Sequence, residues 1–427
     1  MAMPDRLTRQ TSEPLRPGGD FYSLERTMDL SDLAVWQRLI SAWREKRLSA
    51  ALGRRLTPFF KGLKYLFHNP AARHIKLHCP AYVSPNNDEA EMAVVQRIFA
   101  AYRRMTRDQE GANPLYQPSA MWRAQLHRSY AFLISGLAGG NIHKFHYFLT
   151  NFGAWKEYTG VEECTLIQNH MRLAVTRRYL QNEIFHNLLK LWMYYYNGRK
   201  DVSSLWRPGF GNLAGARVDG VLVTVDSFFG EIYGSLLAQL LHQPRPVVAE
   251  LGGGCGRLAY YTVRHLGDFC YLDFDLPETL CLAAYYLMLA FPQKRALLYG
   301  EEEYSPALHQ KYDFIFLPSY EIAKIGSGTV ELFVNETSLG EMTREAISNY
   351  LRYITQATTY FFHINRDRRR NIFADHETSL LGHEYPVPTD RFTLVFRYPD
   401  LKHLVFYGGR VDFNSDAFIY LYEKKHE

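Results

Sequence analysis

The chain has 427 residues, of which 47% are hydrophobic and 22% are charged. A chain of this length is expected to form two domains and can bury a large core without disulfide or metal staples. The net charge of +5 is too small to indicate a nucleic-acid-binding protein. The five cysteines are scattered without a CxxC pair, which excludes a disulfide framework and a zinc site and fits a reducing, cytoplasmic environment. No apolar stretch is long enough to predict an integral membrane segment.

The first half of the chain is expected to be mainly helical. Residues 1–20 are polar and contain Pro and Gly, which predicts a disordered tail. Apolar residues recur at helical spacing in 31–56, 88–107, 119–137 and 162–196. Pro and Gly then crowd into 203–220, which indicates a loop or domain joint, and another helix is expected at 226–242. These patterns predict a helical N-terminal domain over residues 21–225.

From Val247 the pattern changes to strands that alternate with helices. The runs VVAEL, CYLDFD, DFIFLP, VELFVNE and TYFFHIN predict a parallel α/β sheet. The runs FTLVFRYP, HLVFYGG and AFIYLYE follow with short connections, which suits antiparallel strands at one edge. We therefore expect residues 226–427 to form an α/β, Rossmann-like domain. Its mostly parallel seven-stranded sheet with an antiparallel C-terminal edge is the layout of the methyltransferase version of the doubly wound fold.

A glycine-rich motif connects the first of these strands to the next helix. Glycine allows a tight turn and a close backbone approach to a ligand. At the carboxyl edge of an open α/β sheet, such a loop is where nucleotide-like ligands bind. The motif supplies six candidate cofactor-binding residues: Glu250, Gly252, Gly253, Gly254, Gly256 and Arg257.

The acids around the motif favour S-adenosylmethionine as the cofactor. Glu250 precedes the glycines, as is typical of enzymes that use this cofactor, and Asp275 ends the second strand, 19 residues after Gly256. A carboxylate there can accept hydrogen bonds from ribose hydroxyls, with Asp273 in reserve. A cationic sulfonium tolerates nearby acids, whereas a pyrophosphate favours basic groups. The alternative is a nicotinamide or flavin enzyme, because 254–259 also fits GxGxxA. The late position of the motif and the antiparallel end of the sheet argue against that alternative.

Longer segments resemble a known family. VVAELGGGCGRLAYY, YLDFDLPETLCLAAYYLMLAFP and ELFVNETSLGEMTREAISNYL are similar to segments of the putative sugar O-methyltransferase family. That family carries ELGGGxGxLAYY, a DLPE helix start and an N-x-x-S-x-x-E-M block, and the resemblance covers roughly residues 88–425. A departure occurs at Phe228-Phe229-Gly230, where a more polar helix start is expected. The resemblance implies a sugar O-methyltransferase with a class I fold, whose helical N-terminal domain covers the acceptor site.

Methyl transfer to a hydroxyl needs an aligned acceptor and a group that removes its proton. In this fold the acceptor is expected near the ends of the first, fourth and fifth strands, where Glu336 also lies. The candidate catalytic residues are His363, Glu341 and Asn335, and the candidate substrate-binding residues are Ser338, Asn365 and Arg366. Leu276, Ser319 and Asn335 complete the candidate cofactor-binding set.

Two of these assignments have a structural alternative. His363 lies among aromatic residues, where a histidine often serves only packing. Glu341 can act as a base if burial raises its pKa, or can close a capping box with Ser338 at the start of a helix. No compact ligand spacing indicates a metal site.

The function expected from the sequence is S-adenosylmethionine-dependent O-methylation of a sugar in a nucleotide-sugar, glycolipid or polysaccharide. Two alternatives remain: O-methylation of a non-sugar metabolite, and a non-catalytic module of a glycan assembly system. The expected partner is a sugar-containing acceptor and not a nucleic acid, and a homodimer is left open.

Overall fold

The structure is a computed structural model that describes residues 75–78, 80–86, 88–155, 175–373, 378–406 and 416–425. These residues all belong to one compact unit, Tyr65–Glu427. The predicted tail 1–20 and the predicted helix 31–56 lie outside the described residues. Among the helices described, none has the length and apolar character that a membrane span requires.

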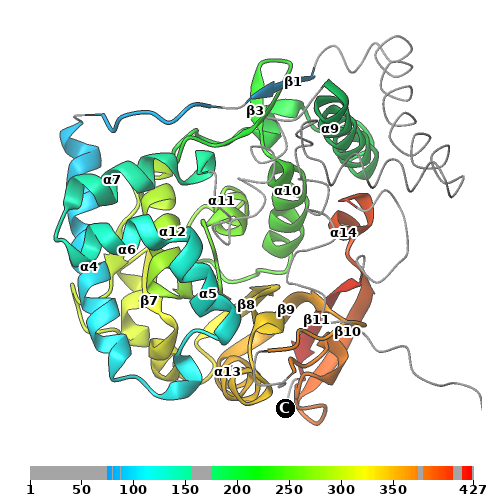
Figure 1. The fold of residues 1–427 in the computed structure, drawn as a ribbon. Coiled ribbons are helices and arrows are strands. Elements are labelled where there is room, and N and C mark those ends of the chain that lie inside the picture. The colour runs from blue at the N-terminus through cyan, green and yellow to red at the C-terminus, as the bar shows by residue number, and fades with distance from the viewer. Residues whose placement is uncertain are drawn as a thin grey trace, which may run out of the picture. The chain divides into compact units, whose positions relative to one another are not determined.

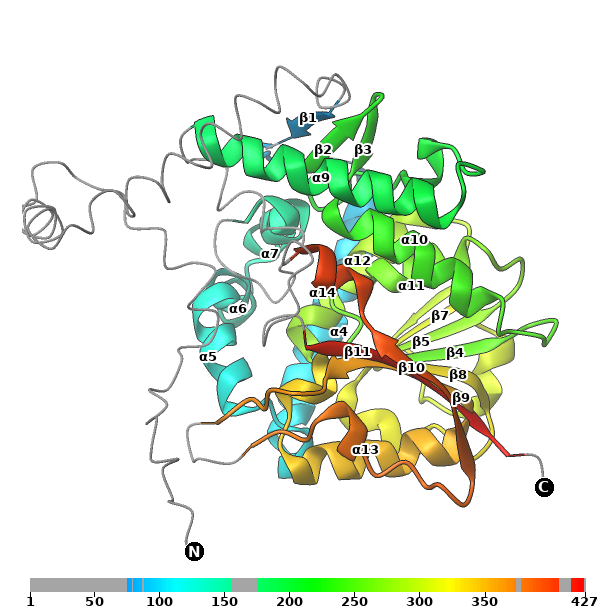
Figure 2. The same cartoon turned by 90° about the vertical axis from the view of Figure 1, so that its right-hand side faces the viewer.

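An eight-stranded sheet organises the second half of the chain (Figure 2). Its strands are, in spatial order, β10 (Phe392–Pro399), β11 (Ala417–Lys424), β9 (Thr358–Arg366), β8 (Val330–Glu336), β4 (Val247–Leu251), β5 (Cys270–Asp275), β7 (Phe314–Pro318) and β6 (Ala296–Leu298). The strands from β9 to β6 are parallel, and β11 and β10 are antiparallel to their neighbours. The predicted fold class, a mostly parallel α/β sheet with an antiparallel C-terminal edge, is confirmed.

Two details of the predicted sheet are wrong. The sheet has eight strands rather than seven, because the short β6 adds an edge strand beside β7. The run HLVFYGG is not a strand: its first four residues belong to helix α14 (Leu401–Phe406), and 407–409 lie outside the described residues. Short apolar runs fit both helix and strand, so periodicity alone does not separate them.

Helices cover both faces of the sheet (Figure 1). One face packs against α10 (Val225–Ala238), α11 (Arg257–Val263) and α12 (Pro277–Ala290) in a large core cluster. The other face packs against α13 (Arg344–Ala357) in a second cluster. The central strands β4, β5 and β7 are therefore buried on both faces, as their continuous apolar runs predict.

The N-terminal helices are α4 (Glu89–Glu110), α5 (Ala120–Ser129), α6 (Ala131–Ala138), α7 (Ile142–Asn151) and α9 (Val175–Tyr195). Helices α4 and α7 pack against α12 (Figure 1), whereas α9 packs against α10. The predicted helix 88–107 matches α4, which Asp88 caps by accepting from the Ala90 amide at 2.9 Å. The predicted helix 119–137 is divided into α5 and α6 at Tyr130. Residues 162–174 of another predicted helix lie outside the described part of the chain.

The predicted loop 203–220 contains regular structure. It holds the short helix η4 (Val202–Leu205) and β2 (Gly215–Val218), and β2 forms a hairpin with β3 (Val221–Val223). This hairpin extends with β1 (Ile75–His78) to a small antiparallel sheet. Here the turn residues Asp219 and Gly220, both with positive φ, form a tight hairpin turn rather than a domain linker.

The apolar start of α10 has a packing explanation. A Cβ atom on Gly230 would lie 2.5 Å from the Tyr261 ring, and one on Gly234 would lie 2.7 Å from the Tyr261 backbone. Phe228 and Phe229 are buried in the same contact region. The departure from the family pattern at 228–230 therefore lies in a close helix–helix contact between α10 and α11.

Candidate functional site

The glycine loop between β4 and α11 adopts a backbone that only glycine adopts readily. Gly252, Gly254 and Gly256 have φ angles of 83°, 60° and 71°. Side chains with a Cβ atom rarely occupy this left-handed region. The Gly252 amide donates to the Phe274 carbonyl at 2.8 Å, which holds the loop against the end of β5.

Three glycines of the loop have no room for a side chain, and the fourth, Gly254, has free space beside it. A Cβ atom on Gly252 would lie 2.4 Å from Ser338 Oγ, and one on Gly253 would lie 2.6 Å from the Asp273 carboxylate. A Cβ atom on Gly256 would lie 2.9 Å from the Leu287 side chain. Nothing lies within 4 Å of a Cβ atom on Gly254. The loop therefore packs tightly on its protein side and presents Gly254 to free space at the carboxyl edge of the sheet.

Three buried acids surround this loop. Glu250 and Asp273 are paired residues of the neighbouring strands β4 and β5, and Asp275 ends β5. Asp275 accepts from the Gly254 amide at 2.9 Å and from the Leu276 amide at 2.7 Å. Glu250 accepts from the Tyr271 hydroxyl at 2.6 Å. The carboxylate predicted to bind ribose is thus in direct contact with the open end of the glycine loop.

Burial makes the three acids reluctant to ionise together. It raises the pKa of Asp275 to about 6 and that of Glu250 to about 7. Burial, followed by the charges of Asp275 and Glu250, raises the pKa of Asp273 far above its usual value. The arrangement suits a ligand that brings positive charge or hydroxyl donors, and it opposes a pyrophosphate.

The neighbouring strand places Ser319 at the same edge. Asp275 pairs with Pro318 in the register of β5 and β7, and Ser319 follows directly, 5% exposed. Leu276 is the N-terminal cap of α12 and is partly exposed. These two predicted cofactor-binding residues therefore lie next to Asp275.

One further acid near Asp275 was not assigned from the sequence. Glu278 belongs to the DLPE segment and lies in the first turn of α12, where it accepts from the Tyr102 hydroxyl at 3.2 Å. Burial raises the pKa of Glu278 to about 7, and the charge of Asp275 adds to this. The DLPE motif is visible in the sequence, but the contact of Glu278 with α4 depends on tertiary packing.

Arg257 is held by acidic side chains of two other elements. Its guanidinium forms ion pairs with Asp226 of α10, at 3.1 Å, and with Glu336 at the end of β8. Lys402 of α14 joins the group by contacting Glu336 at 3.0 Å. Burial raises the pKa of Asp226 to about 8 even beside these cations. Arg257 thus links three elements at the sheet edge, and its assignment to the cofactor stays a prediction.

The predicted residues Asn335, Ser338 and Asn365 form one hydrogen-bond network. Asn335 donates to the Leu251 carbonyl at 2.9 Å, and Ser338 donates to the same oxygen at 2.8 Å. Asn365 donates to Asn335 at 2.8 Å and accepts from the Gly340 amide at 3.1 Å. The network joins the ends of β4, β8 and β9. The two asparagines are buried and committed to this role, whereas Ser338 remains partly exposed.

His363 lies in the core instead of facing an open site. Its side chain is 0% exposed, and its ring stacks on Tyr420 with centroids 4.6 Å apart. Burial lowers the pKa of His363 to about 3, and its Nε2 atom has no hydrogen-bond partner. The ring is therefore neutral but enclosed, which matches the packing alternative better than the predicted role as base.

Glu341 contacts the N-terminal helices. It accepts from Trp122 Nε1 of α5 at 2.8 Å. The capping box expected from Ser338 and Glu341 is wrong, because these residues bound the short helix η7 (Ser338–Glu341) and α13 begins later, at Arg344. Thr343 caps α13 by accepting from the Ala346 amide at 3.3 Å. The Trp122 contact brings α5 to the edge where β8 and β9 end.

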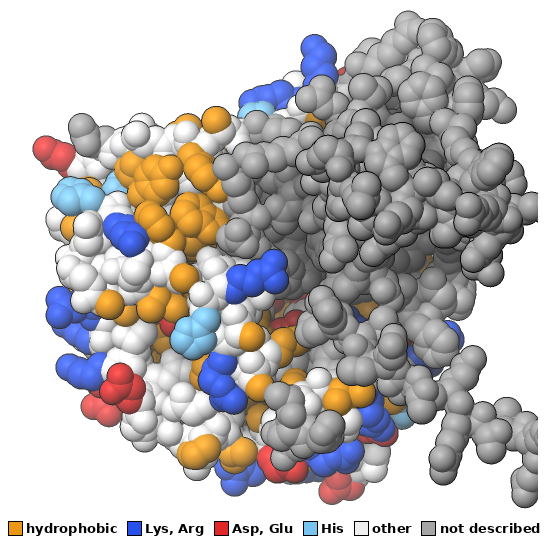
Figure 3. Space-filling model, in the orientation of Figure 1, with side chains coloured by type: hydrophobic (Ala, Val, Ile, Leu, Met, Phe, Trp, Pro, Cys, Tyr) orange, Lys and Arg blue, Asp and Glu red, His pale blue; other side chains and the backbone are white. Residues whose placement is uncertain are grey.

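Arg366 is exposed at the end of β9. It begins a basic stretch with Arg368, Arg369 and Arg370, of which Arg370 pairs with Glu384. On the described part of the face in Figure 3, Lys and Arg side chains are scattered among other types. Within the described residues, no group of three His, Cys, Asp or Glu side chains could hold a metal ion.

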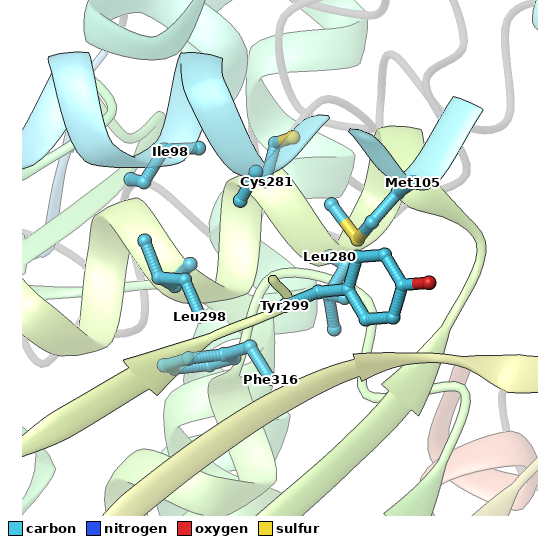
Figure 4. Close-up of a pocket in the computed structure, with 9 residues that line it drawn as sticks. Ile98, Met105, Leu280, Cys281, Leu298, Tyr299 and Phe316 are labelled. Carbon is cyan, nitrogen blue, oxygen red and sulfur yellow. The ribbon is translucent and has the colours of Figure 1, made fainter. Parts of the chain in front are cut away.

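A small cavity lies elsewhere, between α4, α12 and the strands β6 and β7 (Figure 4). Its lining includes Ile98, Met105, Leu280 and Phe316 and carries no charged side chain. Tyr299 points its hydroxyl away from these residues (Figure 4) and donates to Asp108 at 3.0 Å. The cavity is a gap in apolar packing and lacks the polar groups that a catalytic site requires.

Comparisons with known proteins identify methyltransferases among solved structures. The structure of the mitomycin 7-O-methyltransferase MmcR is 12% identical with a TM-score of 0.29, and the match covers 47% of this chain and 56% of that chain. The geranyl diphosphate C-methyltransferase from Streptomyces coelicolor A3(2) is 10% identical with a TM-score of 0.32, covering 45% and 79%. The magnesium protoporphyrin IX methyltransferase from Synechocystis PCC 6803 is 13% identical with a TM-score of 0.31, covering 47% and 82%.

This chain thus matches little more than half the length of the mitomycin methyltransferase. No family model matches the chain, and no curated protein matches it either. At TM-scores near 0.3 the likenesses carry no inference about activity or substrate.

Proposed function

We propose that this chain is an S-adenosylmethionine-dependent methyltransferase that methylates a hydroxyl of a sugar-containing acceptor. The observation that carries the proposal is the glycine loop, which is open at Gly254 and bordered by Glu250, Asp273 and Asp275. It lies at the carboxyl edge of a mostly parallel sheet, where this fold class binds its ligands. The sugar acceptor rests on the sequence resemblance alone.

The residues present fit this cofactor. The space at Gly254 is a cradle that a side chain would fill, and Asp275 beside it can accept from ribose hydroxyls. Glu250 and Asp273 favour a ligand with a cationic end over one with a phosphate. When bound, S-adenosylmethionine supplies an electrophilic methyl group.

The chain itself then has to position the acceptor and remove its proton. The network of Asn335, Ser338 and Asn365 holds the ends of β4, β8 and β9 together, so the two ligands would be presented by one rigid edge. We propose that the described helices α4 to α9 of the predicted helical region 21–225 shield the acceptor from water, with Trp122 contacting Glu341 at their border. Domain 226–427 would carry the cofactor.

Calorimetry tests the cofactor first. We expect micromolar binding of S-adenosylmethionine and S-adenosylhomocysteine and no binding of NADH or NADPH. A nicotinamide preference would overturn the proposal, and binding of none of the four would favour a non-catalytic module. Transfer of a tritiated methyl group to a panel of nucleotide-sugars, with catechol as a non-sugar control, then tests the acceptor class. Labelling of catechol alone would replace the sugar with a non-sugar metabolite.

A further inference from the structure

A second histidine lies beyond the end of β9 and has a different environment from His363. His383, on the short helix η8 (Gly382–Glu384), places its Nδ1 atom 2.8 Å from Asp367 Oδ1. The His383 amide also donates to this oxygen, at 2.9 Å. The Asp367 side chain is 1% exposed, whereas the His383 side chain is 50% exposed. A buried carboxylate thus contacts both the half-exposed imidazole and the backbone amide of His383.

The carboxylate determines which nitrogen of His383 carries hydrogen. Burial alone would raise the pKa of Asp367, but hydrogen bonds from Tyr420, Arg397 and His383 hold that pKa below its usual value. An ionised carboxylate only accepts hydrogen bonds, so Nδ1 of His383 must be the donor. The lone pair of the neutral ring is then on Nε2, the ring nitrogen that does not contact Asp367. This is the arrangement of an oriented general base.

The pair lies at the same edge of the sheet as the glycine loop. Asp367 directly follows β9, which neighbours β8, which in turn neighbours β4. Two strand spacings, roughly 10 Å, separate β4 from β9, so the glycine loop and Asp367 follow strands that end at the same edge. Asn371 donates to the Gly340 carbonyl at 2.6 Å, which ties the segment after β9 to η7.

Another histidine–carboxylate pair in the chain shows why exposure matters. His146 lies 2.7 Å from Glu91, but this histidine is 1% exposed and is enclosed between α4, α7 and α12. Such a pair can only support packing. His383 combines the carboxylate contact with access to a ligand, which neither His146 nor His363 does.

We propose that His383, oriented by Asp367, is the general base that deprotonates the acceptor hydroxyl; the inference rests on the proposed methyltransferase function. The O–H bond of the acceptor breaks and its proton passes to Nε2 of His383. The oxygen forms a bond to the methyl carbon while the methyl–sulfur bond breaks, and that electron pair stays on sulfur. The imidazolium then releases its proton to water.

Among the described residues, several charged and titratable groups surround His383 and Asp367. Arg397 and Tyr420 both donate to Asp367, at 3.1 Å from Arg397 Nε and at 2.6 Å from the tyrosine hydroxyl. Glu384, which directly follows His383 in sequence, forms an ion pair with Arg370. Replacing Glu384 by glutamine removes that ion pair but keeps a side-chain oxygen that can accept from the Leu381 amide, as Glu384 does at 2.9 Å, so E384Q is a matched control.

Nuclear magnetic resonance of the full chain labelled with ¹⁵N-histidine tests the orientation without any acceptor. The His383 signals, assigned by their loss in H383Q, should show the Nδ1–H tautomer, and D367N should convert part of the population to the Nε2–H tautomer. A wild-type ring in the Nε2–H form would overturn the proposal.

Turnover with the nucleotide-sugar panel and tritiated S-adenosylmethionine tests the chemistry. We expect H383Q to lower kcat by about 100-fold or more, with KM within about threefold of wild type. Added imidazole should partly rescue H383G. E384Q should stay within about twofold of wild type.

The outcomes separate the two proposals. Variants that bind S-adenosylhomocysteine like wild type and transfer methyl groups at the wild-type rate would overturn His383 alone, as would an E384Q loss equal to that of H383Q. A wild type that binds the cofactor and methylates nothing in the panel would overturn the sugar acceptor, and the inference with it.

Discussion

The glycine loop after β4 and the loops after β8 and β9 lie at one edge of the sheet but are built differently. The glycine loop is made of backbone: Gly252, Gly254 and Gly256 take left-handed conformations, and Gly254 faces free space. Its acids Asp273 and Asp275 reach it from the next strand. This region is open to a ligand as it stands.

The loops after β8 and β9 are made of side chains that bind one another. Asn335, Ser338 and Asn365 satisfy each other and the end of β4, and His363 is enclosed by aromatic rings. The polar residues at these strand ends, which the sequence predicts as site residues, mostly form hydrogen bonds with one another here. Polar side chains at the carboxyl edge of a sheet therefore mark the functional edge, but burial decides which of them can meet a ligand.

The largest expected effect comes from filling the free space at Gly254 in the glycine loop. Gly254→Arg should lower S-adenosylhomocysteine affinity by more than about 100-fold, because its side chain occupies the free space while the protein around it needs no repacking. The positive φ angle should cost about 1 kcal/mol of unfolding free energy. Calorimetry and urea unfolding measure the two quantities.

Gly254→Ala is the matched control, since it carries the same backbone cost with a much smaller side chain. Unchanged affinity in the arginine variant would mean that the ligand does not bind at this loop.

A smaller effect is expected at the acid beside the loop. Asp275→Asn should weaken S-adenosylhomocysteine binding by about 30-fold, because a neutral amide accepts less strongly from two hydroxyls. Since burial raises the pKa of Asp275 to about 6, wild-type affinity should fall as the pH decreases through 6, and the variant should lack this step. Calorimetry between pH 5 and 8 measures both.

Asp273→Asn serves as the control, because Asp273 is the more enclosed acid and contacts the Gly253 amide at 3.3 Å. A larger loss in this variant than in Asp275→Asn would assign the ribose contact to Asp273 instead.

The smallest expected effect concerns His363 of β9, in the region where polar side chains are enclosed. The pKa of His363 is about 3 in the folded chain and 6.5 when unperturbed, so the unfolded state binds the proton first as the pH decreases. His363 therefore costs no stability above pH 6.5 and increasingly destabilises the fold between 6.5 and 3. At pH 5.5 the loss should be about 1.4 kcal/mol, and His363→Phe should abolish it.

Urea unfolding at pH 7.5 and 5.5 compares the two proteins. His143→Gln, at an exposed position on α7, is the control and should keep the wild-type pH dependence. An equal loss of stability on acidification in wild type and His363→Phe would show that His363 is accessible to protons in the folded state.

Prediction from the sequence succeeded where a local pattern carries the information. The five parallel strands follow from apolar runs between turn signals, and the glycine motif was placed correctly between β4 and α11. Prediction failed for short elements. The strand β6 has only three residues and was not predicted, and the segment 401–406, part of which was predicted as a strand, is helical. The contact of Glu341 with Trp122 could not be predicted from a local pattern, because Trp122 is 219 residues away.

The sequence by itself determined five of the parallel strands, the glycine loop and the acid at the end of β5, because each depends on residues close together in the chain. Only the tertiary structure decided which polar side chains are enclosed. His363 and His383 both lie near the end of β9 and are equally plausible bases by residue type. Packing buries the first among aromatic rings and leaves the second half-exposed against Asp367. Burial and partner contacts come from residues far apart in sequence, so no local pattern distinguishes the two.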